Sequence, residues 1–257
     1  MPALKEWRSY IPTSIDKETK LPKPNRDEDE ITMSYETLSK LSLSRDSSYV
    51  FVCDSNEDVD FSVVLDLLNL GNPSVITFKS INEGLYYSLK NTPSVLTVVS
   101  SKPPAGAVSM IFNNKGLVQI TKYELKKEFL GFLRTEIIDE KALDELVTEA
   151  SVNTATKILS RLTRYKRVKD GNISLVNGFI RNPRLFEKVL SYLKLKKVDS
   201  SIVEELRKQG YEVNLGTAVA LIKVAERCSS NMKVVYVGGT ISEGLMILHM
   251  KCVGGVS

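Results

Sequence analysis

The stretches YVFVC at Tyr49–Cys53, SVITF at Ser74–Phe78 and SVLTVV at Ser94–Val99 decide the fold. Each is a short run of β-branched and aromatic residues, which is typical of strands. The segments between them, residues 61–70 and 81–89, carry apolar residues at helical spacing. Strands that alternate with helices at short spacing usually pair in parallel. We therefore predict a small sheet with three parallel strands.

Two more strands are predicted directly after this unit. The Lys-Pro-Pro-Ala-Gly run at 102–106 is a firm break in the pattern. The apolar runs Val108–Phe112 and Leu117–Thr121 then flank Asn-Asn-Lys-Gly, a four-residue loop that favours a hairpin. The predicted fold class is α/β or α+β, with a small mixed sheet of three parallel strands plus a hairpin.

Beyond Lys122 the apolar period becomes helical. Ser201 and Glu204 have capping-box spacing, and Gly210 follows the same run as a helix-ending residue. Strand-like runs return at 234–237 and 245–253, and we predict that they form a terminal strand pair that packs back on an earlier unit. We find no internal repeat. The predicted units are a mobile arm and tether at 1–30, an α/β domain at 31–121, a mostly helical domain at 122–232, and the terminal pair at 233–257.

The N-terminal arm contains the only tryptophan of the chain. Leu4, Trp7, Tyr10 and Ile11 lie at helical spacing and form a short apolar stripe. The segment behind them contains Pro22, Pro24 and a charge run, a composition that does not order itself alone. The stripe either folds back on its own domain or docks on a second copy, and we treat these four residues as candidate oligomerisation residues.

Composition excludes several classes. The chain has 257 residues, of which 42% are hydrophobic, enough for one large core or two modest ones. It has no apolar run of about 18 residues, so we expect no transmembrane segment. The three cysteines match no zinc pattern, and buried, reduced thiols in a cytoplasmic or otherwise intracellular protein are expected. The single histidine, His249, lies in an apolar run and is interpreted as structural.

An acidic loop follows the first predicted strand. In parallel sheets, ligands bind at the carboxyl ends of strands. Asp54, Asp58 and Asp60 could hold Mg²⁺ there and act on a phosphate ester. The competing interpretation is a polar turn whose carboxylates cap the next helix. The glycine-containing loop at 238–244 has no complete phosphate-binding signature and is interpreted as a hairpin turn.

The charge distribution is the most uneven property of the sequence. Residues 151–198 contain twelve Lys or Arg against Asp170 and Glu187, a net charge of +10, whereas the whole chain is +4. Such a surface suits nucleic acid, anionic lipid or an acidic face of another copy, although it can also be an ordinary solvated face. The candidate polyanion-binding residues are Lys157, Arg161, Arg164, Lys166, Arg167, Lys169, Arg181, Arg184 and Lys188.

These observations lead to one functional hypothesis and two alternatives. The hypothesis is a non-enzymatic, self-associating structural protein that binds RNA or another polyanion in a packaging or scaffolding role and needs no cofactor. The first alternative is a Mg²⁺-dependent enzyme that acts on phosphate esters through the acidic loop. The second is a peripheral layer on an anionic membrane surface.

Overall fold

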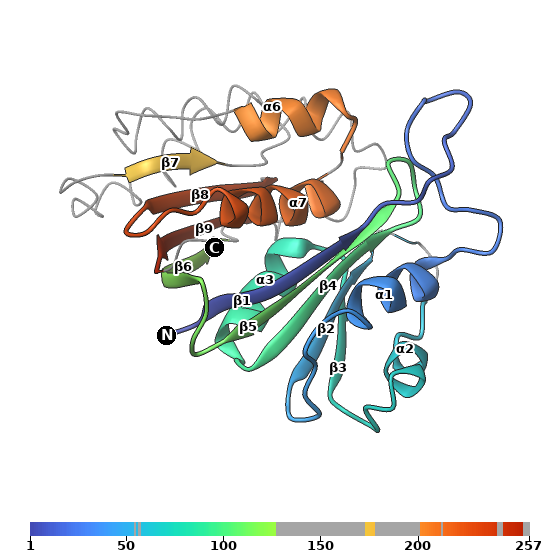
Figure 1. The fold of residues 1–257 in the computed structure, drawn as a ribbon, viewed down its shortest axis with the longest axis horizontal. Helices are drawn as coiled ribbons and strands as arrows, with labels where there is room; N and C mark the ends of the chain where they lie inside the picture. The colour runs from blue at the N-terminus through green and yellow to red at the C-terminus, as the bar shows by residue number, and fades with distance from the viewer. Residues whose placement is uncertain are drawn as a thin grey trace, which may run out of the picture.

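The computed structural model describes residues 1–53, 55, 58–126, 173–177, 201–211, 213–240 and 244–253. These residues form one nine-stranded mixed sheet with helices on both faces (Figure 1). The strand order is β3-β2-β4-β5-β1-β6-β9-β8-β7. The strands are β1 (Ala3–Tyr10), β2 (Ser48–Cys53), β3 (Val75–Phe78), β4 (Ser94–Ser100), β5 (Gly106–Asn113), β6 (Val118–Lys126), β7 (Ile173–Asn177), β8 (Lys233–Thr240) and β9 (Gly244–Cys252). The helices are α1 (Glu30–Leu38), α2 (Ser62–Leu67), α3 (Ile81–Lys90), α6 (Ser201–Lys208) and α7 (Val213–Glu226).

The predicted α/β fold class is confirmed, and so is its parallel unit. Strand β2 pairs in parallel with both β3 and β4, with Tyr49 opposite Val75 on one side and Val95 on the other. Successive side chains of a strand point to opposite faces. Tyr49, Phe51 and Cys53 therefore contact the layer of α1 and α2, while Val50 and Val52 contact the layer of α3 and α7.

The N-terminal stripe is a strand in the middle of the sheet instead of a helix. Strand β1 lies between β5 and β6 and pairs antiparallel with both. It therefore separates the two strands that the sequence predicted as a hairpin. Strand β6 also runs across the predicted domain boundary at 121–122. The following segment, residues 11–29, is tied to the domain, because the carbonyl oxygen of Pro22 accepts a hydrogen bond from the N–H of Ala105 (2.8 Å).

The sheet consists of two halves with matching topology, although the sequence analysis found no repeat. Outward from the β1–β6 junction, one half reads β1-β5-β4-β2 and the other reads β6-β9-β8-β7. In each half the first three strands are antiparallel neighbours and the fourth is parallel to the third. A helix precedes the third strand in each, α3 before β4 and α7 before β8. These helices begin with related sequences, Ile81-Asn82-Glu83-Gly84 and Val213-Asn214-Leu215-Gly216.

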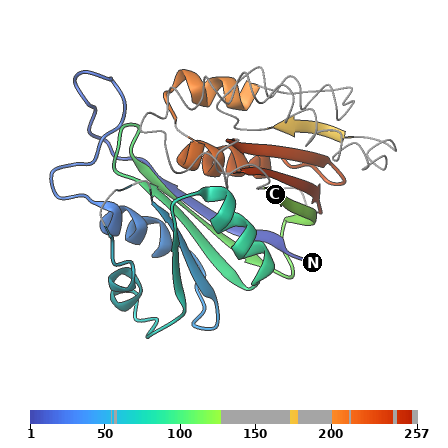
Figure 2. The same cartoon turned by 180° about the vertical axis from the view of Figure 1, so that it is seen from behind.

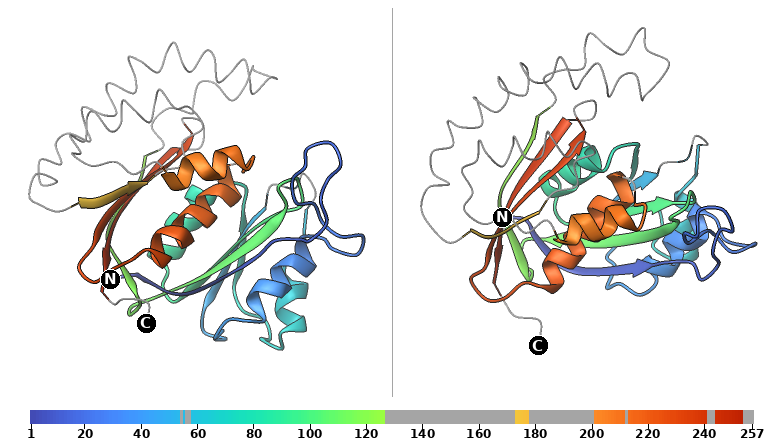
Figure 3. Two further views of the ribbon diagram at one scale, coloured as in Figure 1. Left: turned by 45° about the horizontal axis from the view of Figure 1, so that its top comes forward. Right: turned by 90° about the horizontal axis from the view of Figure 1, so that it is seen from above.

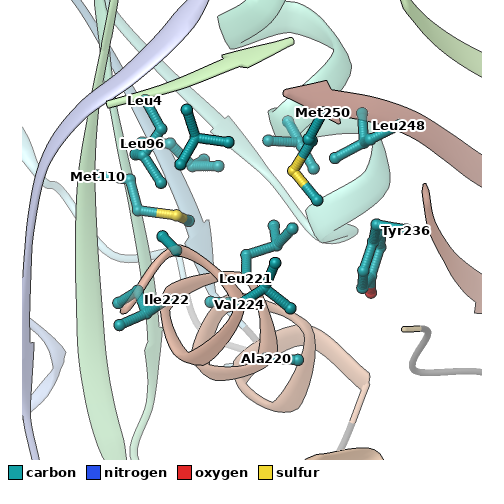
Figure 4. Close-up of a cluster of buried hydrophobic side chains, with 14 of the residues drawn as sticks. Leu4, Leu96, Met110, Ala220, Leu221, Ile222, Val224, Tyr236, Leu248 and Met250 are labelled. Carbon is teal, nitrogen blue, oxygen red and sulfur yellow. The ribbon is translucent and has the colours of Figure 1, made fainter. Parts of the chain in front are cut away.

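Both matching helices lie on the concave side of the curved sheet (Figure 3). The view from behind shows α3 on the face opposite α1 and α2 (Figure 2). The larger apolar core lies between these helices and the sheet, with α7 contributing Leu221 and Val224 and β9 contributing Leu248 (Figure 4). The core is tightly packed: a void of about 10 Å³ beside Leu85, lined by apolar side chains, is no larger than one water molecule needs.

Two observations concern the predicted environment of the chain. Within the described ranges, none of the helices combines the length and the apolar character needed to cross a bilayer. Cys228, just after α7, forms a disulfide with Cys252 on β9, which corrects the expectation of reduced thiols at these positions. Cys53 is buried and forms no disulfide.

Candidate functional site

The N-termini of α3 and α7 meet at the carboxyl end of β3. Ser80 is the residue between β3 and α3: it has extended backbone angles, occupies the N-cap position and is 6% exposed. Its hydroxyl makes no capping bond to its own helix. The sheet and both central helices therefore place a buried serine hydroxyl at the point where a parallel strand ends, which is where open α/β sheets bind ligands.

Asn214, in the first turn of α7, holds the backbone on both sides of Ser80. Its Oδ1 accepts a hydrogen bond from the N–H of Ile81 (2.9 Å), and its Nδ2 donates to the carbonyl oxygen of Lys79 (2.8 Å). Asn214 is itself 6% exposed. The side chain thus replaces one of the missing partners at the start of α3. A single buried amide from one half of the sheet fixes the geometry of the serine in the other half.

The electrostatics of this point favour negative charge. Each helix N-terminus carries a partial positive charge, and the two helices bring their N-termini together here. Lys79, the residue after β3, donates from Nζ to the carbonyl oxygen of Ser55 (2.6 Å). Backbone N–H groups that lie at helix N-termini and are shielded from water can stabilise an oxyanion that forms during acyl transfer.

Within the part of the chain that the structure describes, neither the thiol of Cys53 nor the imidazole of His249 faces this point. Cys53 belongs to the core under α1 and α2, on the opposite face of the sheet from α3. His249, the only histidine of the chain, alternates along β9 with Leu248 and Met250, which contact the α3–α7 layer. Its side chain therefore points to the outer face, and its pKa is lowered by burial and by the nearby Lys122. The chemistry at Ser80 does not include this imidazole or the Cys53 thiol.

In the predicted acidic loop, Asp60 lies in the turn that leads into α2, whose N-cap residue is Phe61 and makes no side-chain capping bond. Asp60 Oδ1 accepts from the backbone N–H of Ser62 (3.0 Å) and from its hydroxyl (2.6 Å), and these bonds lower the pKa of Asp60. Asp58 is exposed, and Asp54 lies outside the described residues. In the described part of the chain, no three His, Cys, Asp or Glu side chains gather in a way that could hold a metal ion.

The candidate oligomerisation residues contact their own chain. Leu4 is 4% exposed within the large core, and Trp7 packs against the same core. The Tyr10 hydroxyl donates to Glu28, and only Ile11, at 49%, is largely exposed. The nine candidate polyanion-binding residues, Lys157 to Lys188, all lie outside the described residues.

Sequence reasoning missed Ser80 and Asn214. The strand end Lys79–Ser80 was visible, but it carries no acidic residue, and the search for chemistry was directed at carboxylates and basic runs. The available signal was the repeated Ile/Val-Asn-x-Gly at 81–84 and 213–216. Four residues are too few to establish a repeat until the topology pairs the two helices.

Comparisons with solved structures show that this architecture is known. The 3-oxoacyl-(acyl carrier protein) synthase III of Pseudomonas aeruginosa PAO1 matches over 100% of this chain and 99% of its own, with TM-score 0.64 and 14% identity. The acyltransferase ChlB3 matches over 99% of this chain and 98% of its own, with TM-score 0.68 and 13% identity. An HMG-CoA synthase complexed with CoA matches over 99% of this chain and 83% of its own, with TM-score 0.63 and 11% identity. No protein-family model matches the chain, and no curated protein matches its sequence significantly.

These neighbours overturn the predicted function. They are condensing enzymes and an acyltransferase, and the chain shares their fold over nearly its whole length. The prediction of a non-enzymatic RNA-binding structural protein is wrong, and so are the predicted partners: RNA or another polyanion, an anionic membrane surface, and a second copy bound through the arm. The prediction rested on the basic segment, on the N-terminal arm with its tryptophan, and on the lack of a complete catalytic signature. Net charge reports on solubility and non-specific association, whereas it says little about the fold.

Proposed function

We propose that this chain is an acyltransferase of the condensing-enzyme type, acting on an acyl group carried as a thioester on CoA or on an acyl carrier protein. The observation that carries the proposal is the buried Ser80 where the N-termini of α3 and α7 meet, in a fold shared with enzymes of such names. The neighbours' titles name acyl carrier protein and CoA, which supports the same substrate class for this chain.

The proposed step is acyl transfer to Ser80. The Oγ atom of Ser80 attacks the thioester carbonyl carbon, a C–O bond forms, and the C–S bond breaks. The hydroxyl proton leaves with the sulfur as a free thiol. Because serine is a weak nucleophile, most of the rate must come from stabilising the oxyanion. The positive ends of the two helices supply this stabilisation, and burial of Ser80 keeps water from hydrolysing the ester.

Acid-quenched mass spectrometry of the full chain tests this proposal. After incubation with acetyl-CoA, or with acetyl-phosphopantetheine as a mimic of the carrier protein, the protein gains one acetyl group on the peptide that contains Ser80. Ser80→Ala abolishes the label. The control Ser88→Ala changes another buried serine of the same helix and keeps the label. The proposal is contradicted if neither thioester acetylates the wild-type protein, or if Ser80→Ala is still acetylated on that peptide.

Two sequence predictions stay outside this test. An intracellular location is consistent with an enzyme that uses CoA, and we retain it as part of the proposal. A Mg²⁺ ion at Asp54, Asp58 and Asp60 remains a separate prediction, and the proposed acyl transfer does not require it.

A further inference from the structure

A second polar contact lies one turn along α7 from Asn214. The Tyr236 hydroxyl, on β8, donates a hydrogen bond to Oγ1 of Thr217 (3.0 Å), and both side chains are 0% exposed. Figure 4 shows the ring of Tyr236 beside α7, with its hydroxyl turned away from Leu248 and Met250. A buried phenol that lost its partner would be costly. The contact therefore constrains how α7 lies on the C-terminal half of the sheet.

Gly238 makes room for this contact. It lies two residues after Tyr236, on the same face of β8, and a Cβ atom there would overlap the Tyr236 ring and hydroxyl. Any side chain at position 238 would displace the phenol from Thr217. The position that matches Thr217 in α3 is Leu85, a buried residue of the apolar core, so the N-terminal half has no hydroxyl at this place.

Thr217 and Asn214 are three residues apart and so share one face of α7. The same helix face is thus bound to β8 through Thr217 and to the backbone around Ser80 through Asn214. We propose that Tyr236, Thr217 and Gly238 are positioning residues: they set the rotation of α7 so that the Asn214 amide reaches both peptides that flank Ser80. This inference rests on the proposed function only in its assumption that Ser80 is acylated, since the positioning of Asn214 does not depend on that reaction.

Hydrogen exchange of the Ile81 amide gives a readout that does not depend on activity, because that N–H is bonded to Asn214 Oδ1. We expect Tyr236→Phe to speed exchange of this amide roughly fivefold, the effect of losing one buried hydrogen bond. Tyr49→Phe is the matched control. It removes a hydrogen bond of 2.9 Å from another buried tyrosine, to the carbonyl oxygen of Ser44, in the N-terminal half.

Thr217 provides the second pair of variants. Thr217→Val keeps the shape of the side chain and removes the hydroxyl, so it should speed exchange of the Ile81 amide as Tyr236→Phe does. Thr217→Ser keeps the hydroxyl, so the Ile81 amide should stay as protected as in the wild type. In acylation assays, Tyr236→Phe should lower the rate of Ser80 acetylation at saturating acetyl-CoA and leave the half-saturating concentration unchanged.

The outcomes separate the two proposals. Faster Ile81 exchange in Tyr236→Phe and Thr217→Val, but not in Tyr49→Phe or Thr217→Ser, supports the positioning role. It does so even if the wild-type protein is never acetylated, in which case only the proposed function fails. If Ile81 exchanges no faster in Tyr236→Phe than in Tyr49→Phe, the positioning role is refuted, whatever the acylation assay shows.

Discussion

The two halves of the sheet share a topology but fasten their central helices by different means. In the N-terminal half, α3 lies so close to the sheet that a Cβ on Gly84 would come within 2.6 Å of Val52 Cγ2. In the C-terminal half, α7 is held by the Tyr236–Thr217 hydrogen bond and, beyond its end, by the disulfide of Cys228. One helix is positioned by close apolar packing, and the other by polar and covalent links.

This difference corresponds to the burial of the two helices. α3 buries one face, with Leu85 and Leu89 in the core. α7 has ten buried residues among fourteen, because it packs against α3, α6 and strands of both halves of the sheet. Because most of the surface of α7 is apolar, apolar packing alone leaves the rotation of the helix about its axis weakly defined. Specific polar contacts at Asn214 and Thr217 therefore define its orientation, and Asn214 is also the residue that reaches Ser80.

The largest expected effect comes from removing the covalent link of the C-terminal half. Replacing Cys228 and Cys252 together by serine should lower the free energy of unfolding by about 3 kcal/mol, since the closed loop spans 24 positions. Urea unfolding with and without reductant measures this. Reductant should destabilise the wild type and Cys53→Ser, and leave the double variant unchanged. If reductant leaves the urea midpoint of the wild type unchanged, the Cys228–Cys252 disulfide does not stabilise the protein.

The next effect tests the close packing of the N-terminal half. Gly84→Ala places a Cβ against Val52 Cγ2 and 3.3 Å from Leu96 Cδ1. Overpacking costs about 1–3 kcal/mol, and the better helix propensity of alanine returns at most ~1 kcal/mol, so we expect a net loss of stability. Chemical denaturation measures it.

Val52→Ala provides the control for this packing. The Gly84→Ala, Val52→Ala double variant should be more stable than the sum of the two single effects predicts, because the shortened side chain makes room for the new methyl group. Additive effects, or a Gly84→Ala protein more stable than the wild type, would show that α3 is not held by this contact.

The smallest effect concerns His249 in the C-terminal half. Burial and Lys122 lower its pKa below the ordinary 6.5, so the folded protein favours the neutral imidazole. The unfolded chain then binds more protons as the pH falls through about 6.5, and stability drops until the pH is below the folded pKa. His249→Gln should flatten this part of the curve of unfolding free energy against pH. Identical curves for the two proteins between pH ~7.5 and ~5.5 would show no such coupling.

Local signals predicted the elements of the fold well. The β-branched runs at Tyr49–Cys53 and Ser94–Val99 became strands in the predicted parallel arrangement. The helices near 81–89 and 201–210 and the terminal β8–β9 pair also formed as predicted. Each of these signals lies within a few residues along the chain, and short-range sterics and periodicity decide such elements.

Pairing over long distances was not predictable in the same way. The three-residue spacing of Leu4 and Trp7 predicts a helix, but both residues lie on a strand. Such spacing alone does not distinguish one face of a helix from a strand that is buried on both faces. Only the sheet shows that β1 inserts between β5 and β6. The candidate site has the same origin. Ser80 and Asn214 are 134 positions apart in the sequence, and the four-residue pattern around Asn214 is too short to connect them.

By itself, the sequence determined the α/β class and the parallel strands around Tyr49–Cys53. The tertiary structure alone decided which of its polar residues meet. The reason is physical: a buried amide such as Asn214 is placed by the need to satisfy hydrogen bonds on a helix that packs from the other half of the molecule. Those partners lie in distant parts of the chain, where no local pattern can identify them.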